Sequence, residues 1–298
     1  MSNFVVKISD PEYPSMLKHI HQAPDKLYYR GDLEILEGKL VAFVGTRACT
    51  PYGRVVTEKL VEELSLCGVV IVSGLARGID TCAHEAALRF GLKTVAVLGT
   101  GIDNIYPSEN EKLSEKIVAD GGCILSEYGM RAPARKFAFP ARNRIISGLS
   151  LATVVVEAPE SSGALITAKR ANEEDREVFA VPADIDRDGS VGCNRLIQGL
   201  FAKPVLTGMD IIRELKMQPG LFRESASLGG KDGGREDLGL GNEVNSVFEA
   251  ISNIRPVSVD QVIQKTGLSV VSVNKSLSLL EINNFVSGTN NGFYLRSF

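Results

Sequence analysis

The sequence predicts a doubly wound α/β domain with a parallel sheet, followed by a glycine-rich linker and a second, smaller domain. From residue 40 onward, short apolar runs rich in β-branched residues alternate with stretches of helical periodicity. Nearly continuous apolar strands separated by helices are typical of a parallel sheet that is buried on both faces. The chain of 298 residues, 44% of them hydrophobic, is long enough for a large core and a further module.

The predicted elements of the main domain, residues 40–218, follow one another along the chain. We expect strands at 40–46, 69–74, 94–100, 123–128, 153–159, 178–184 and 203–207. We expect helices near 52–67, 78–90, 108–119, 142–150, 162–176 and 208–216. Residues 1–39 are too few for a separate domain, so we expect an N-terminal extension packed on the main domain.

A shift in composition marks the end of this domain. Residues 219–242 carry seven glycines in 24 positions and little apolar periodicity, which is typical of a flexible linker. After it we expect helices near 243–253, 258–265 and 269–281, a turn at 266–269, and a hairpin over 285–295 with Asn-Gly at its tip. This order of elements predicts a small winged helix-turn-helix domain over residues 243–298.

Composition and charge narrow the class of protein. The formal net charge of −3 argues against a protein that coats nucleic acid with its whole surface, but it allows a local basic patch. The five cysteines are scattered without C-x-x-C spacing, so we expect reduced structural thiols. The N-terminus lacks the pattern of a secretion signal, and no apolar run approaches the length of about 18 residues needed to cross a membrane. We therefore expect a cytoplasmic protein without a membrane segment.

Glycines, serines and basic residues follow several predicted strands, where ligands bind to open parallel sheets. They occur in the segments 45–53, 73–80, 136–144 and 159–170. Helix N-termini there offer unpaired N–H groups to an anion, and glycine lets the backbone approach it closely. None of the segments matches G-x-G-x-x-G or G-x-x-x-x-G-K-[ST], so the NAD fingerprint and the ATP P-loop are both missing. Each loop alone could be an ordinary tight turn, but their combination with arginines favours a ligand site.

The segment 131–144 is both basic and aromatic. It contains five cations and no acidic residue, with Phe137 and Phe139 interleaved among them. Cations for phosphates and aromatic faces for bases favour binding of single-stranded nucleic acid. The alternative is a solvated basic loop that the two phenylalanines anchor.

Helical periodicity predicts different roles for the two arginines of the helix expected at 142–150. At about 100° per residue, Arg142 lies on the apolar side of this helix and Arg144 lies opposite. We therefore expect Arg142 to face a pocket at the strand ends, beside Arg47, and Arg144 to reach outward toward a longer ligand. Asn143 is expected to cap the helix or to bind a phosphate.

The residue patterns do not indicate catalysis. His84 is the only histidine of the main α/β region, and its place within a predicted helix favours a core or helix-face role over a general base. Ser73 and Ser126 end strands but lack a G-x-S-x-G elbow and a histidine partner. The acidic residues show no metal-ligand spacing with His or Cys. We expect no catalytic residue, no metal and no cofactor.

Several motifs together resemble the DNA-processing protein A (DprA) family. They include "SGLARGID" at 73–80, "FPARNRIISGLS" at 139–150 and "EAPESSGALITAKRA" at 157–171. The resemblance spans about residues 10–216. It implies a Rossmann-like domain that binds and protects single-stranded DNA, forms a homodimer, and loads the RecA recombinase during natural transformation or recombination. It implies no enzymatic activity.

The resemblance also implies which residues contact DNA. In the first two loops these are Gly45, Thr46, Arg47, Ser73, Gly74, Arg77 and Gly78. In the basic segment they are Lys136, Phe137, Phe139, Arg142, Asn143 and Arg144. In the later helix they are Ser162, Gly163, Thr167 and Lys169. The family often has a serine at the position of Thr46, and an additional N-terminal helical domain that we do not expect here.

Two other functions stay open. One is a nucleotide-processing enzyme like those of the lysine-decarboxylase-like Rossmann group, whose P-G-G-x-G-T-x-x-E signature ends in a catalytic glutamate. The corresponding residues 161–169 lack that glutamate. The other is a nucleotide sensor with the winged helix as its output.

The predicted recognition helix of the C-terminal domain has one cation, Lys275, against Glu281, so weak DNA contact and protein contact are equally compatible with it.

Overall fold

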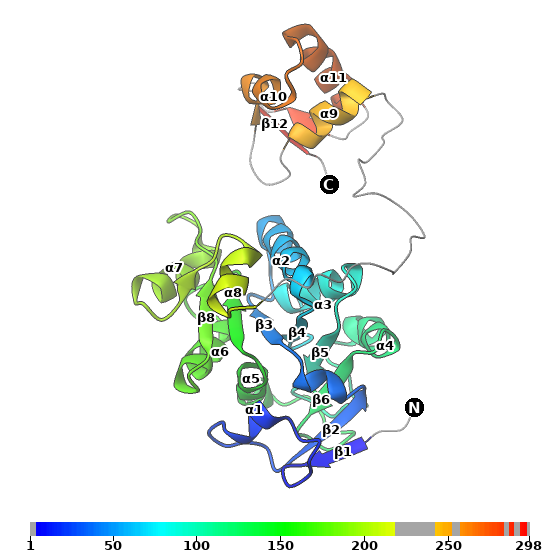
Figure 1. Cartoon of the computed structure of the whole chain (residues 1–298), viewed down its shortest axis with the longest axis vertical. Coiled ribbons are helices and arrows are strands. Elements are labelled where there is room, and N and C mark those ends of the chain that lie inside the picture. The colour runs from blue at the N-terminus through cyan, green and yellow to red at the C-terminus, as the bar shows by residue number, and fades with distance from the viewer. Residues whose placement is uncertain (1–3, 218–241, 252–256, 283–285, 289–292, 297–298) are drawn as a thin grey trace. The chain divides into compact units, whose positions relative to one another are not determined.

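The computed structural model describes residues 4–217, 242–251, 257–282, 286–288 and 293–296 (Figure 1). The chain divides into two compact units, Met1–Leu221 and Phe222–Phe298. The predicted linker, residues 219–242, lies outside the described residues except for Asn242, and so does the Asn-Gly tip of the predicted hairpin. No helix in the described part of the chain is long and apolar enough to cross a membrane.

A nine-stranded mixed sheet forms the centre of the first unit. Its strands are β1 (Phe4–Lys7), β2 (Lys26–Gly31), β3 (Leu40–Val44), β4 (Val70–Ser73), β5 (Thr94–Val97), β6 (Cys123–Ser126), β7 (Ala152–Val155), β8 (Glu177–Ala180) and β9 (Lys203–Pro204). In space they follow the order β1-β2-β6-β5-β4-β3-β7-β8-β9. Strands β3 to β9 run parallel to one another, whereas β2 pairs antiparallel with β6, and β1 antiparallel with β2.

The two antiparallel strands correct the expectation of a purely parallel sheet. Both β1 and β2 come from the N-terminal segment, ahead of the first predicted strand. In β2 only Leu27 is fully buried, because this strand lies near the edge of the sheet. It therefore lacks the continuous apolar run that identifies a strand covered on both faces. The same segment packs on the core through Tyr13 and Leu17, which are both buried.

Helices on both sides of the sheet complete the first unit. They are α1 (Ser15–Lys18), α2 (Pro51–Leu64), α3 (Ile79–Arg89), α4 (Glu111–Ala119), α5 (Ala138–Leu149), α6 (Gly163–Glu173), α7 (Val191–Gln198) and α8 (Gly208–Glu214). Helix α5 begins at Ala138 and not at the predicted residue 142. Pro140 is tolerated there because the backbone N–H groups of a first turn have no partner within the helix. The short helix α7 was not predicted.

Side chains alternate between the two faces of the sheet, as the pleat of a strand requires. In β3, Val41 and Phe43 pack on one face, whereas Ala42 and Val44 pack on the other. Helices α2 and α3 cover the first face, and α5 and α6 cover the second (Figure 1). Because β3 is buried throughout, its sequence is apolar at every position.

The strand order reverses at β3, the first parallel strand along the chain. Strand β4 lies on one side of β3 and β7 lies on the other. The chain leaves β3 toward α2 on one face and leaves β7 toward α6 on the opposite face. Loops that diverge in this way open a crevice at the carboxyl ends of the strands, which is where open α/β sheets bind ligands.

The second unit has its own core and a three-stranded antiparallel sheet. Its elements are α9 (Asn242–Ala250), β10 (Val257–Ser258), α10 (Val259–Thr266), α11 (Val270–Ile282), β11 (Val286–Gly288) and β12 (Phe293–Arg296). The sheet has the order β10-β12-β11. Ser258 and Gln261 form a capping box at the start of α10, and Gly267 ends it with a φ of 68°. Buried residues of the three helices, such as Val262 and Leu277, form one apolar cluster.

Candidate nucleic-acid interface

Loops at the carboxyl ends of the parallel strands line a groove of about 630 Å³. A cavity of about 50 Å³ adjoins it, and the two share Arg47, Ala76, Tyr106, Phe139 and Arg142. Among the residues expected to contact DNA, the groove contains Gly45, Thr46, Arg47, Lys136, Phe139, Arg142, Asn143, Ser162, Gly163 and Thr167. The smaller cavity adds Gly74 and Arg77. Segments far apart in the sequence therefore meet at one place.

Close backbone contacts hold the loop between β3 and α2 against α3. The Thr46 amide donates to the Glu157 carbonyl at 2.7 Å, and the Ile79 amide donates to the Thr46 carbonyl at 3.2 Å. A Cβ atom on Gly78, whose φ is 77°, would lie 2.3 Å from the Thr46 carbonyl oxygen. A Cβ atom on Gly45 would lie 2.5 Å from the Ile79 side chain. The two glycines are needed for this close approach of the loops.

A buried carboxylate anchors the far end of the same loop. Glu157 accepts a hydrogen bond from the Thr50 amide at 2.9 Å and another from the Thr50 hydroxyl at 2.5 Å. Thr50 is the N-cap residue of α2, and its hydroxyl accepts from the Gly53 amide at 3.2 Å. A negative charge at a helix N-terminus interacts favourably with the helix dipole. Sequence analysis missed this role of Glu157, because residues over 100 positions apart meet here.

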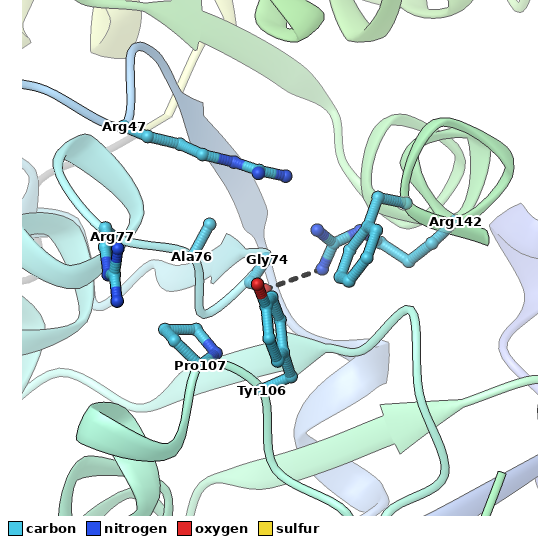
Figure 2. Close-up of a pocket in the computed structure, with 8 residues that line it drawn as sticks. Arg47, Gly74, Ala76, Arg77, Tyr106, Pro107 and Arg142 are labelled. Atoms are coloured by element: carbon cyan, nitrogen blue, oxygen red, sulfur yellow. Dashed lines mark hydrogen bonds between the residues drawn. The ribbon is translucent and has the colours of Figure 1, made fainter. Parts of the chain in front are cut away.

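Two aromatic rings and one arginine line the groove together. The guanidinium carbon of Arg47 lies 5.5 Å from the centre of the Phe139 ring, within the range of a cation–π interaction. The Phe139 ring centre is 5.4 Å from that of Tyr106, which is 48% exposed. Figure 2 shows Arg47 extending from its loop across the cavity, with Tyr106 and Arg142 on the other sides. Tyr106 was not predicted, although an aromatic residue in a loop after a strand is a usable signal.

The two phenylalanines of the basic segment differ in position. Phe139 is half-buried and lines both the groove and the smaller cavity. Phe137 is 63% exposed and lines neither. Phe137 is the N-cap residue of α5, and two positions along a helix correspond to a rotation of about 200°, so the two rings point in different directions. A ligand in the groove can reach Phe139 without any rearrangement of the helix.

Arg142 is a buried cation that lines the groove beside Arg47. Its Nη1 donates to the carbonyl of Gly74 at 2.7 Å (Figure 2) and also to the carbonyl of Val97. A Cβ atom at Gly74 would lie 2.5 Å from the guanidinium group. Burial lowers the pKa of Arg142 to about 10, so the side chain is still charged at neutral pH. Arg142 connects the ends of β4 and β5 and supplies a fixed positive charge.

Asp80 holds the loop between β4 and α3 through hydrogen bonds to the backbone of that loop. Its Oδ2 accepts hydrogen bonds from the amides of Gly74 at 3.1 Å and Ala76 at 3.3 Å. Between them, the buried Leu75 has a φ of 57°, a conformation that costs energy for a residue with a Cβ atom. Burial raises the pKa of Asp80, and the charge of Arg142 opposes that rise. The loop is therefore held in one strained conformation by a carboxylate that sequence analysis did not assign to the site.

Arg144 does not reach outward, which corrects the expectation for this residue. Its guanidinium group forms two hydrogen bonds with Glu127, at 2.8 and 2.6 Å, and the two side chains are only 15% and 16% exposed. Its Nε donates to the Gln22 carbonyl at 3.0 Å. Arg144 does lie on the side of α5 opposite Arg142, but Glu127 and, from the N-terminal segment, Gln22 occupy that side and pair with it. It is not among the residues that line the groove.

Asn143 does not cap α5, because the helix begins at Ala138. Its Nδ2 donates to the Gly163 carbonyl at 3.3 Å and so connects α5 with the first turn of α6. The N-cap residue of α6 is Ser162, whose hydroxyl accepts from the Ala164 amide at 3.2 Å. These contacts place the N-terminus of α6 at the edge of the groove.

Three further predicted residues, Gly78, Ser73 and Lys169, do not line the groove, and Gly78 serves the contact with Thr46 described above. Ser73 is fully buried, and its hydroxyl donates to the Phe43 carbonyl at 2.7 Å, so it supports the sheet. Lys169 lies on another side of α6 than Thr167, and its Nζ is 3.8 Å from Oε1 of Glu173. Lys169 lines a separate apolar cavity with Phe201 and neighbouring residues. A spacing of two residues on a helix explains why Thr167 faces the groove and Lys169 does not.

Arg77 lies at the smaller cavity but is paired with a carboxylate. Its Nε and Nη2 donate to Glu109 at 2.7 and 2.6 Å, and both side chains are exposed. By contrast, Arg47 forms no ion pair with a carboxylate within the described ranges. Of the two, Arg47 is thus the cation that an incoming anion can engage without displacing a competitor.

The histidine of the main domain lies apart from the groove. His84 is buried in the core, its Nδ1 lies 2.7 Å from the Thr94 hydroxyl, and burial lowers its pKa to about 3. It does not line the groove. Within the described ranges, no three His, Cys, Asp or Glu residues are arranged to hold a metal ion.

A family model described as DNA recombination-mediator protein A matches residues 4–216. The chain belongs to this family. The match includes β1 and every strand of the large sheet, and it ends near the last helix of the first unit. The resemblance expected from the sequence motifs is confirmed.

Relatives with substantial identity come from several bacteria. The chain is 49% identical over 209 residues to DNA processing protein DprA of Streptococcus pneumoniae, covering 70% of this chain and 73% of the relative. It is 39% identical to Protein Smf of Synechocystis, covering 93% of this chain and 76% of the relative. It is 42% identical to DNA processing protein DprA of Bacillus subtilis, covering 70% of each.

Solved structures of the same family resemble the first unit. The X-ray structure of DNA processing protein A from Streptococcus pneumoniae has a TM-score of 0.69 at 47% identity, over 72% of this chain and 75% of that one. The Helicobacter pylori protein of the same name, described for its unique single-stranded DNA binding mode, has a TM-score of 0.65 at 32% identity. That likeness covers 72% of this chain and 96% of the other.

Proposed function

We propose that this protein binds single-stranded DNA in the groove and acts without catalysis in recombination or natural transformation. The observation that carries the proposal is the convergence of Arg47, Lys136 and Arg142 with the Phe139 and Tyr106 rings in one groove. Guanidinium and ammonium groups bind phosphates, and aromatic faces stack on bases of any sequence. The Helicobacter pylori relative, described for single-stranded DNA binding, supports the same assignment.

The residues of the groove have different roles, which follow from how exposed their side chains are. Arg47 and Lys136 are exposed and bind the phosphates of the strand. Arg142 is buried and strengthens binding through its charge at short range, since it already donates to two carbonyls. Tyr106 and Phe139 provide the apolar surface on which one base lies.

We extend the proposal to RecA loading and to a homodimer in the cytoplasm. Leu200, Phe201 and Leu206 flank β9 and are 91%, 61% and 70% exposed. Strand β9 is an edge strand of the large sheet. Exposed apolar side chains beside an edge strand are a suitable surface for a second copy of the chain. The RecA role rests on family membership alone.

The second unit is proposed to be a winged helix-turn-helix domain with a protein partner. Its order of helices and strands and its antiparallel sheet support the assignment. Val270 and Val271 at the start of α11 are 55% and 77% exposed, and Lys275 is the single cation of this helix. A helix that enters the major groove of DNA ordinarily presents several cations and polar side chains to it. An apolar exposed face favours contact with protein.

The proposal is tested by fluorescence anisotropy of labelled oligo-dT with the full chain. Arg47→Ala should weaken binding about tenfold, because it removes a charge-assisted hydrogen bond worth about 1.5 kcal/mol or more. The matched control is Arg89→Ala, at the C-terminal end of α3 and so at the opposite edge of the sheet. Equal losses for the two variants would contradict the assignment of the groove.

Competitors separate the proposed function from the two alternatives. An unlabelled oligonucleotide should displace the labelled strand, whereas a large excess of mononucleotide should not, since one phosphate and one base use only part of the groove. Displacement by mononucleotide at comparable concentration would favour a nucleotide sensor. Release of a free base from a nucleoside monophosphate would favour the enzyme.

A further inference from the structure

Two cysteines from different elements lie in contact beside the groove. The Sγ atoms of Cys49 and Cys82 are 3.8 Å apart. Cys49 belongs to the loop between β3 and α2, and Cys82 to the first turns of α3. The remaining cysteines are all buried, and none of their sulfur atoms is in such a contact within the described part of the chain.

The surroundings of the pair make it accessible from one side. Cys49 is partly exposed, whereas Cys82 is only 5% exposed. The two elements also touch elsewhere, through the hydrogen bond between the Ile79 amide and the Thr46 carbonyl at 3.2 Å. The sulfur atoms are therefore held near one another by the fold, and a reagent in solvent meets Cys49 first.

We propose that Cys49 and Cys82 form a redox modification site, which a peroxide converts to a disulfide that joins the Arg47 loop to α3. The existence of this site is independent of the proposed function. Its consequence for DNA binding rests on that function, because Arg47 is only two residues from Cys49.

The reaction balances in two steps. The Cys49 thiolate attacks one oxygen of hydrogen peroxide, the O–O bond breaks, and the products are a sulfenic acid on Cys49 and a hydroxide ion, which takes up the proton that the Cys49 thiol released and becomes water. The Cys82 sulfur then attacks the sulfenic sulfur, the S–O bond breaks, and the departing hydroxide takes the Cys82 proton to form a second water. Peroxide is reduced and the two thiols are oxidised. Burial raises the pKa of the Cys82 thiol to about 12, which agrees with its assignment to the second step.

The disulfide shortens the distance between the two elements. The sulfur atoms must approach from 3.8 Å to about 2.05 Å. Hydrogen bonds hold both ends of the loop, Thr46 through Glu157 and Ile79, and Thr50 through Glu157. We therefore expect any backbone movement of this loop to fall on residues 47–49. A charge-assisted hydrogen bond requires about 2.7–2.9 Å between its heavy atoms, so a shift of this size breaks a contact from Arg47 to phosphate. We expect the oxidised protein to bind oligo-dT about tenfold more weakly than the reduced protein.

The first experiment maps the thiols of the full chain after treatment with hydrogen peroxide. Non-reducing peptide mapping by mass spectrometry should find a peptide pair linked through Cys49 and Cys82, and dithiothreitol should reverse the link. The matched control is Cys67→Ser, which should leave the link intact. Absence of the linked pair, when a methionine or another thiol is already oxidised, would overturn the proposal.

The second experiment compares oligo-dT binding by the reduced and the oxidised chain. Wild type should lose affinity on oxidation and regain it with dithiothreitol, whereas Cys49→Ser and Cys82→Ser should show equal affinity under both conditions. A disulfide that forms without any change of affinity would overturn the effect on the Arg47 loop. Failure of the reduced protein to bind oligo-dT would instead refute the proposed function, and peptide mapping would still decide whether the site exists.

Discussion

Neighbouring loops of the groove present two arginines with different neighbours. Arg47 lies over the Phe139 ring, whereas Arg77 forms two hydrogen bonds with Glu109. Both members of the Arg77–Glu109 pair are more than half exposed, so the pair adds little to stability. Its main effect is on the ligand, because a phosphate must compete with the Glu109 carboxylate for Arg77.

Glu109→Gln should therefore tighten single-stranded DNA binding by about two- to fivefold, the range that corresponds to an exposed ion pair. The amide still accepts one hydrogen bond but no longer carries a negative charge. The measurement is the anisotropy titration with oligo-dT at low salt, with Glu115→Gln on α4 as the control for loss of one surface charge. Weaker binding by Glu109→Gln would mean that the pair holds Arg77 in its binding position.

His84 makes the stability of the first unit depend on pH. Burial lowers its pKa from 6.5 to about 3, so the folded protein takes up a proton there less readily than the unfolded chain. The neutral His84 ring makes its full contribution to the free energy of unfolding above about pH 6.5, and this contribution is lost as the pH falls toward 3. We expect this residue to lower the free energy of unfolding by about 1.4 kcal/mol per pH unit in that range.

Urea unfolding at several pH values between neutrality and mild acid measures this dependence. The control is His84→Gln, whose side-chain amide can keep the hydrogen bond with Thr94 but does not titrate. The slope of stability against pH should be shallower in the variant. Identical slopes would show that His84 is not the group responsible.

The residues of the site illustrate what helix phase can and cannot predict. Arg142 was predicted to face the strand ends from its position relative to apolar neighbours, whereas Thr167 was named only because the family resemblance implies it. Arg144 was expected to reach outward because helix phase does not show which segments cover a given side, and here Glu127 and Gln22 lie against it. Pro140 lies within the first turn of the helix.

At the scale of elements, contacts at the N-terminus of α2 anchor the loop that carries Arg47. Thr50 caps the helix and also donates to the buried Glu157. Thr50→Ala should lower the free energy of unfolding by about 1–2 kcal/mol, the usual cost of removing an N-cap side chain. It should also weaken DNA binding, since the loop loses its anchor.

Chemical denaturation and oligo-dT titration of the same variants test this coupling. Thr50→Ser keeps the hydroxyl and should restore both properties. If Thr50→Ala lost stability but bound DNA like wild type, the Glu157–Thr50 contact would serve the helix alone.

The predictability of the elements depended on their burial. Strands β3 to β8 were predicted because they are covered on both faces and therefore apolar throughout. Strands β1 and β2 were missed because neither is buried throughout: Val5 in β1 is 42% exposed, and only Leu27 is fully buried in β2. Strand β9 is an exception, since it was expected at 203–207 although Lys203 and Pro204 are exposed. Helix α7, Val191–Gln198, was also missed, although α8 and α10 are no longer than it and were predicted.

At the scale of the whole molecule, the chain has a net charge of −3, yet the charged residues that line the groove are mainly cations. Several exposed arginines are matched by carboxylates, as in the pairs Arg54–Glu85, Arg89–Glu58 and Arg195–Glu160. Arg47 has no such match within the described ranges, and Arg142 adds a buried charge nearby. Arg47, Lys136 and Arg142 line the groove together with one carboxylate, Asp80, so its lining carries a net positive charge, which favours a polyanion there.

The salt dependence of oligo-dT binding tests the central claim most directly. For single strands, the logarithm of the binding constant falls with the logarithm of salt concentration by about 0.7 for each phosphate that the protein neutralises. If Arg47 and Lys136 each bind a phosphate, Arg47→Ala and Lys136→Ala should each reduce that slope by about 0.7, while Arg89→Ala leaves it unchanged. A slope that is the same in wild type, Arg47→Ala and Lys136→Ala would contradict the claim that single-stranded DNA lies in this groove.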